Sequence, residues 1–245
     1  MTILHNSLVC LAIALVAFLY AAVGQGGSTG YIAVMTLFGF GATVVKPTAL
    51  FLGILVASIG AFQFWRAGHF SWTLFWRFAL LSVPSAYLGG YLRVPSQLFR
   101  LLLGVILLVS AAWLLWRHRE PAKVTLPKAP IALIAGAVIG FFAGLMGTGG
   151  GYFLTPLLLF CEWARTRNAA AASVFFILVN SIAGLFGYLY SGQPLPSMAI
   201  LLAGAAIAGG SLGSHYGSRR LPARGIQWLL AIVLILAAAN LILAR

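Results

Sequence analysis

A cluster of glycines inside an apolar stretch occurs at corresponding positions in the two halves of this sequence. Residues 24–28 read Gly-Gln-Gly-Gly-Ser, and residues 147–151, half a chain length further on, read Gly-Thr-Gly-Gly-Gly. Residues 57–60 and 180–183 match at the same separation. Self-similarity over such a long period, with helix-breaking glycines at matched positions, predicts that the chain folds as two related structural repeats.

The composition restricts where such a chain can fold. Hydrophobic residues make up 62% of it and charged residues 7%, and its mean hydropathy is +1.04. Soluble domains carry about 25% charged residues. We therefore expect an integral membrane protein with the lipid bilayer as its surroundings, long enough for about eight to ten membrane segments.

The apolar stretches divide evenly between the halves. They cover residues 7–23, 31–45, 47–65, 72–92, 98–116, 130–146, 152–164, 168–190, 196–217 and 224–244. We expect an all-α polytopic protein with a first membrane repeat at 1–116, a basic cytoplasmic linker at 117–129 and a second membrane repeat at 130–245. Each repeat then has about five helical segments.

Two of these stretches are short, and each directly follows a glycine cluster. Residues 31–45 and 152–164 would cover about 22 Å and about 20 Å as helices, against a hydrocarbon core of about 30 Å. Each is expected to pair with the preceding segment as a bent or re-entrant hairpin. The glycines then lie near the bilayer midplane, where irregular backbone is tolerated only inside protein or beside a polar cavity.

The net charge of +13 is explained by loops on one side of the membrane. If each hairpin returns the chain to the side it left, eleven basic residues share one side, which should be cytoplasmic: Arg66, Arg77, Arg117, Arg119, Lys123, Lys128, Arg165, Arg167, Arg219, Arg220 and Arg224. Only Lys46, Arg93, Arg100 and Arg245 fall on the other side. Both termini would then be extracytoplasmic in an inner membrane, and we expect no nucleic-acid partner.

This arrangement gives each half an odd number of crossings. The second half must then enter the membrane in the opposite direction to the first. The sequence therefore predicts inverted repeats, related by a pseudo-two-fold axis in the membrane plane, whose glycine hairpins meet in the middle.

Glycine clusters of this kind are suited to binding an anion. They expose backbone N–H groups, and the helix after each cluster adds the positive end of its dipole. The alternatives are close helix packing through small residues for the glycines, and interhelical hydrogen bonds for the polar side chains. The candidate substrate-binding residues are Gly24, Gln25, Gly26, Gly27, Ser28, Thr29, Gly147, Thr148, Gly149, Gly150, Gly151, Ser58, Asn180 and Ser181.

Other chemistry has little support in the sequence. The chain has no Asp, and its acidic residues are Glu120 and Glu162. Cys10 and Cys161 are isolated in apolar segments and form no metal-ligand pattern. We expect no cofactor, no metal and no catalytic residue, and therefore no enzyme.

The motif Gly147-x-Gly-Gly-Gly-x4-Pro156-Leu157, the half-length repeat and the basic central linker resemble the TauE/SafE sulfite exporter family, also called the 4-toluene sulfonate uptake permease family. The resemblance covers essentially the whole chain. The first half departs from the motif, with Ser28 at the third glycine and Ala33 at the proline. The resemblance implies a carrier for small anions, often sulfite or sulfonates.

Three functions from different classes remain open. The leading one is a secondary transporter of small, sulfur-containing anions that works by alternating access. A passive anion channel is the second, and a membrane-embedded enzyme is the third. Small residues on lipid-facing helices would also permit a homodimer.

Overall fold

The computed structural model describes residues 3–92, 97–116 and 124–243, and within these ranges every regular element is an α-helix. The helices are α1 (Ile3–Ala22), α2 (Ser28–Leu37), α3 (Ala42–Arg66), α4 (Trp72–Tyr91), α5 (Gln97–Trp116), α6 (Ala129–Met146), α7 (Gly151–Phe160), α8 (Thr166–Tyr190), α9 (Ser197–Arg219) and α10 (Ala223–Leu243). The predicted all-helical class is confirmed for this part of the chain. Most of the expected linker, residues 117–123, lies outside it.

Four of the described helices, α3, α6, α8 and α9, are long and apolar enough to cross a membrane. The longest are α3 and α8, with 25 residues each. Each rises about 37 Å at 1.5 Å per residue, more than a hydrocarbon core of about 30 Å. The chain is therefore a multi-pass membrane protein, as its composition predicted.

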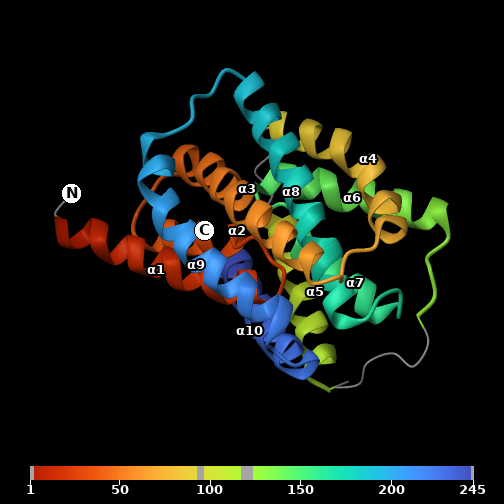
Figure 1. Cartoon of the computed structure of the whole chain (residues 1–245). Coiled ribbons are helices and arrows are strands. Elements are labelled where there is room, and N and C mark those ends of the chain that lie inside the picture. Colours follow the sequence, from red (N-terminus) through yellow and green to blue (C-terminus); the bar gives the residue numbers. More distant parts are fainter. Residues whose placement is uncertain (1–2, 93–96, 117–123, 244–245) are drawn as a thin grey trace.

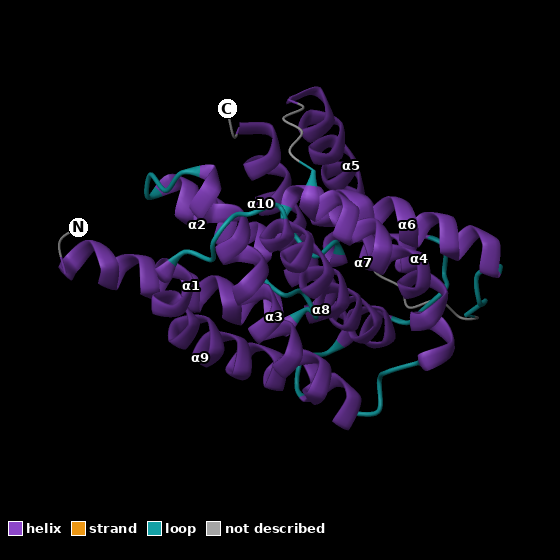
Figure 2. Cartoon of the chain, turned by 90° about the horizontal axis from the view of Figure 1, so that it is seen from above, coloured by secondary structure: helices purple, strands orange, loops and turns teal. Residues whose placement is uncertain are grey.

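The two longest helices form the centre of the molecule. In Figure 1, α3 and α8 lie side by side, with α1 and α9 on one flank and α4 and α6 on the other. Figure 2 shows the same order from above, with α5 and α10 packed together along a third side. Corresponding helices of the two halves make corresponding contacts. The first helix of each half packs on the fourth helix of the other half, α1 on α9 and α6 on α4, and the third helix of each half does the same, α3 on α9 and α8 on α4.

Glycines allow the flanking helices to approach closely. A Cβ atom at Gly136, Gly140 or Gly144 of α6 would collide with backbone carbonyls of α4, and α9 meets α1 through glycines at the same spacing of four residues. The carbonyl partners on α4 are those of Phe78, Ser82 and Ala86. For these glycines, which the sequence analysis did not consider, close helix packing is therefore the structural role.

One expected boundary is wrong. The stretches 31–45 and 47–65 were divided at Lys46-Pro47, but α2 ends at Leu37 and α3 begins at Ala42. Gly39, with φ +81°, ends α2, because glycine adopts this left-handed conformation without strain. Pro47 leaves the carbonyl of Thr43 without its usual helical donor, and the hydroxyl of Tyr188 donates to that carbonyl at 3.1 Å.

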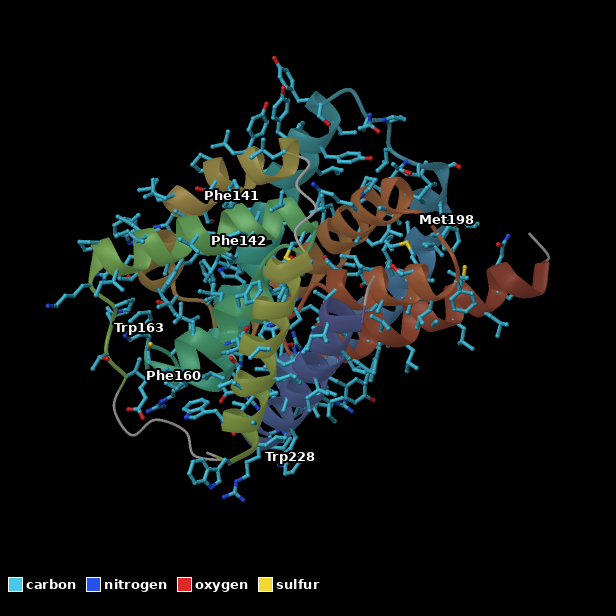
Figure 3. The ribbon with its side chains drawn as sticks, turned by 180° about the vertical axis from the view of Figure 1, so that it is seen from behind. Phe141, Phe142, Phe160, Trp163, Met198 and Trp228 are labelled. Atoms are coloured by element: carbon cyan, nitrogen blue, oxygen red, sulfur yellow. The ribbon has the colours of Figure 1, made fainter. Side chains whose placement is uncertain are left out.

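Loops from both halves are joined at one end of the molecule. The side chain of Asn168 donates to the carbonyl of His69 at 2.8 Å, and His69 Nε2 donates to the carbonyl of Ser218 at 3.1 Å. Arg167 donates to the carbonyl of Leu221 at 2.9 Å. Phe160, Trp163 and Trp228 lie in the lower part of Figure 3, whereas Met198 lies in the upper right. The loop after α3, the start of α8 and the end of α9 are therefore held together, and Arg167, one of the basic residues expected on the cytoplasmic side, takes part in this contact.

Candidate functional site

Both glycine clusters fold in the same way at the end of the preceding helix. Gly24 and Gly147 each have φ +74°. The N–H of Gln25 bonds to the carbonyl of Tyr20 at 2.9 Å, and the N–H of Thr148 bonds to the carbonyl of Ala143 at 2.9 Å. These are the bonds of a glycine-terminated Schellman cap. The predicted helix breaks are confirmed at both positions.

A second left-handed glycine starts each of the short helices. Gly27, with φ +82°, is the N-cap of α2, and Gly150, with φ +80°, is the N-cap of α7. Neither N-cap supplies a side-chain hydrogen bond. The first N–H groups of these ten-residue helices therefore lack the usual cap, although the backbone around them is buried. We call residues 24–28 the first tip and residues 147–151 the second tip.

The two tips meet beside the middle of α3 and α8. A Cβ atom at Gly26 of the first tip, or at Gly149 of the second, would lie 2.7 Å from the same atom, Ile177 Cγ2 on α8. A Cβ atom at Gly53 on α3 would lie 2.5 Å from Ser28 Oγ and 3.5 Å from Ser181 Oγ. Ile177 and Gly53 each lie near the centre of a 25-residue helix. We call this meeting point the tip junction.

Two hydroxyl groups at the tip junction have no hydrogen-bond partner in the structure. Ser28 is 2% exposed and Ser181 is 0% exposed, and the Oγ atoms of both are buried and unsatisfied. Ser181 Oγ also lies 2.8 Å from the position of a Cβ atom on Gly149. A buried polar group without a partner costs about 1–3 kcal/mol. Two such groups at one point favour a site that a ligand completes.

Gln25 links the first tip to the second. Its Nε2 donates to Thr155 Oγ1 at 2.7 Å and to the carbonyl of Gly151 at 3.3 Å. Thr155 Oγ1 in turn lies 2.7 Å from Ser173 Oγ on α8. Gln25 was predicted as a site residue, whereas Thr155 and Ser173 were missed. The position of Thr155, four residues after Gly151 and directly before Pro156, is the sequence signal that could have indicated it.

The remaining predicted polar residues lie around the junction with other partners. Thr29 is buried in the first turn of α2. Thr148 accepts a hydrogen bond from the hydroxyl of Tyr152 at 2.9 Å. Asn180 Oδ1 accepts one from Ser82 on α4 at 2.9 Å, while its Nδ2 has no partner in the structure.

Ser58 is not brought to the junction with the others. It is exposed, and its hydroxyl donates at 2.7 Å to the carbonyl of Ile54 in the preceding turn of its own helix. Ser58 was paired with Ser181 because the two positions match in the repeat. The two serines therefore match in sequence but not in their surroundings. On α3 the residue that contacts the tips is Gly53, whereas on α8 the residues that contact them are Ile177 and Ser181.

Lys46 is a further residue that the sequence analysis treated only as a loop charge. It is half-buried on α3, and a Cβ atom at Gly147 of the second tip would lie 2.8 Å from its Cγ. Its ammonium donates to the carbonyl of Gly90 at 3.3 Å and lies 5.8 Å from the centroid of the Tyr188 ring. The tip is therefore flanked by a positive charge.

The sequence of this chain is similar to a transporter family and to several probable membrane transporter proteins. The model of the sulfite exporter TauE/SafE family matches residues 9–241. A probable membrane transporter protein, y4hK, of Sinorhizobium fredii is 40% identical over 95% of this chain and 96% of its own length. A probable membrane transporter protein of Haemophilus influenzae is 25% identical over 96% of this chain and 98% of its own length. No solved structure matches the chain.

Proposed function

The chain belongs to the sulfite exporter TauE/SafE family of membrane transporters, and we propose that it is a secondary transporter whose substrate, a small oxyanion such as sulfite or a sulfonate, binds at the tip junction. The observation that carries this proposal is the pair of buried hydroxyls of Ser28 and Ser181, which have no partner between two uncapped helix starts. Hydroxyl and backbone N–H donors can stabilise an oxyanion, and the N-terminal ends of α2 and α7 favour negative charge.

The proposed mechanism is alternating access between two inverted repeats. Its support is the exchange of helix contacts between the halves and the position of the tips beside the centres of α3 and α8. The end that carries Arg167 and His69 would be cytoplasmic. Sites between broken helices at the midplane are a recurring feature of secondary transporters.

The burial of the tip junction favours a carrier over a channel. Gln25, Ser28 and Ser181 are buried together, so the conformation described is closed around them. A carrier must open this region to one side at a time, whereas a channel needs a continuous path past it.

Counterflow in proteoliposomes tests the proposal. Purified protein would be reconstituted into vesicles preloaded with sulfite, isethionate or glycolate, and uptake of the labelled anion would be followed. A carrier gives saturable uptake that the internal anion accelerates. Flux that neither saturates nor responds to the internal anion would instead support the channel, and no flux from protein shown to be folded would contradict an oxyanion substrate.

Ser28→Ala and Ser181→Ala test the site itself. Because neither hydroxyl has a partner in the structure, its removal should leave the melting temperature unchanged or raise it. Loss of a hydrogen bond to a charged ligand, about 1.5–3 kcal/mol, should weaken anion binding roughly tenfold to a hundredfold. Ser214→Ala is the control, because the Ser214 hydroxyl donates within α9 to the carbonyl of Gly210. Unchanged transport in both site variants would place the substrate elsewhere.

A further inference from the structure

The groups that flank the two tips favour negative charge. Lys46 packs against Gly147 of the second tip, and α2 and α7 begin at the tips. Glu162 lies beyond the far end of α7, about 15 Å along the helix from the second tip. The other acidic residue, Glu120, belongs to the central linker, and the chain contains no Asp.

Several carbonyl groups that could otherwise receive a cation at the tips already accept hydrogen bonds. The carbonyls of Tyr20 and Ala21 accept from the first tip, and those of Ala143 and Gly144 accept from the second. The carbonyl of Gly151 accepts from Gln25 and Thr155. The polar groups that lack partners at the junction include the hydroxyls of Ser28 and Ser181, which can donate to an oxyanion.

We propose that the tip junction selects anions that carry no cationic group, and therefore rejects amino-sulfonates and amino acids. This inference rests on the proposed function and narrows its substrate class. An ammonium group brought into the junction would leave water, where it is well solvated, to approach Lys46 and the positive ends of two helices. An oxyanion with a hydroxyl at the same position has no such charge to desolvate.

Two pairs of compounds test this selectivity, because the members of each pair differ only in a hydroxyl or an ammonium group. Isethionate is paired with taurine, and glycolate is paired with glycine. Each compound would compete against counterflow of the labelled anion that the proteoliposomes transport best. We expect the ammonium member of each pair to compete at least about tenfold more weakly than the hydroxyl member.

Lys46 provides a second measurement. Lys46→Gln keeps a donor for the carbonyl of Gly90 but removes the charge. It should reduce the difference in competition strength between isethionate and taurine, whereas Lys46→Arg, which keeps the charge, should leave this difference unchanged. Lys128→Gln, which removes an exposed charge at the start of α6, is the matched control and should also leave the difference unchanged.

The outcomes separate this inference from the function on which it rests. Equal competition by taurine and isethionate, or by glycine and glycolate, would overturn the selectivity while leaving an anion carrier in place. If Lys46→Gln does not change the difference in competition between isethionate and taurine, the charge of Lys46 is not the source of the selectivity, and the proposed role of Lys46 would be overturned. Absence of counterflow with every anion would overturn the proposed function, and the selectivity with it.

Discussion

At the scale of single residues, Gly53 is the test of how tightly the tip junction is built. A Cβ atom there would lie 2.5 Å from Ser28 Oγ, so Gly53→Ala should force the hydroxyl away from the junction. We expect transport to fall about tenfold, the loss of roughly one hydrogen bond to the anion. Alanine is the better helix former, so the melting temperature should change little.

Gly204→Ala, on α9, is the control for this substitution, because a Cβ atom at Gly204 would have no neighbouring atom within 4 Å. It should leave counterflow intact. If Gly53→Ala transports as well as Gly204→Ala, the geometry at Ser28 is not important for the substrate.

His69 gives a prediction for pH at the same scale. Burial lowers the pKa of its imidazole, the bond to the carbonyl of Ser218 raises it, and the nearby Arg167 lowers it, for a net decrease. The folded protein then holds fewer protons on His69 than the unfolded chain does. The stability linked to this lowered pKa, which comes chiefly from burial of the neutral ring, is complete above the unfolded-state pKa of about 6.5 and is lost as the pH falls toward the folded-state pKa.

Thermal unfolding in detergent at pH 7.5 and pH 5.5 measures this effect. On acidification, the wild-type protein should lose about 1–2 °C more than His69→Gln, which keeps an amide donor but does not titrate. An equal loss in both proteins would mean that other groups control the response to acid.

At the scale of helices, the sequence predicted where the chain breaks better than it predicted what each break faces. The glycines at 24 and 147 indicated both tips, because left-handed turns depend on local backbone conformation. The sequence predicts a boundary at Lys46-Pro47, but a proline near the start of a helix is tolerated when another group satisfies the carbonyl it leaves free. That donor, Tyr188, comes from the other half, and no local pattern predicts it.

The bond between Tyr188 and Thr43 can be tested with a double-mutant cycle. Tyr188→Phe leaves the Thr43 carbonyl without this donor and should cost about 1 kcal/mol in the free energy of unfolding. In a Pro47→Ala background the helix itself supplies an N–H to Thr43, so the same change should cost less. Equal costs in the two backgrounds would show that Tyr188 does not replace the missing helical donor.

At the scale of the whole molecule, the composition predicted the helical membrane class, whereas the contacts between individual side chains were not predicted. The duplicated glycine clusters indicated two units, and the structure pairs helices of one half with helices of the other in exchanging order. Ser58 and Ser181 match in the sequence repeat but differ in their surroundings, because Ser58 bonds within its own helix whereas Ser181 is buried at the junction without a partner. Long-range partners such as Thr155 for Gln25 depend on how the halves meet, which one sequence does not encode locally.

The proposed orientation makes the last prediction. In a variant without Cys10 and Cys161, a single cysteine would replace either Lys128, at the start of α6, or Gly192, in the turn after α8. A membrane-impermeant maleimide added to intact cells should label the Gly192 position and should reach the Lys128 position only after the membrane is opened, because the basic end is expected in the cytoplasm. Both positions are at exposed or open sites, so a missing signal would not be due to burial. If the cysteine at position 128, and not the one at position 192, is labelled from outside, the orientation is opposite to the one proposed. If both cysteines are labelled from the same side, the chain between residues 128 and 192 crosses the membrane an even number of times, whereas the proposed orientation requires an odd number.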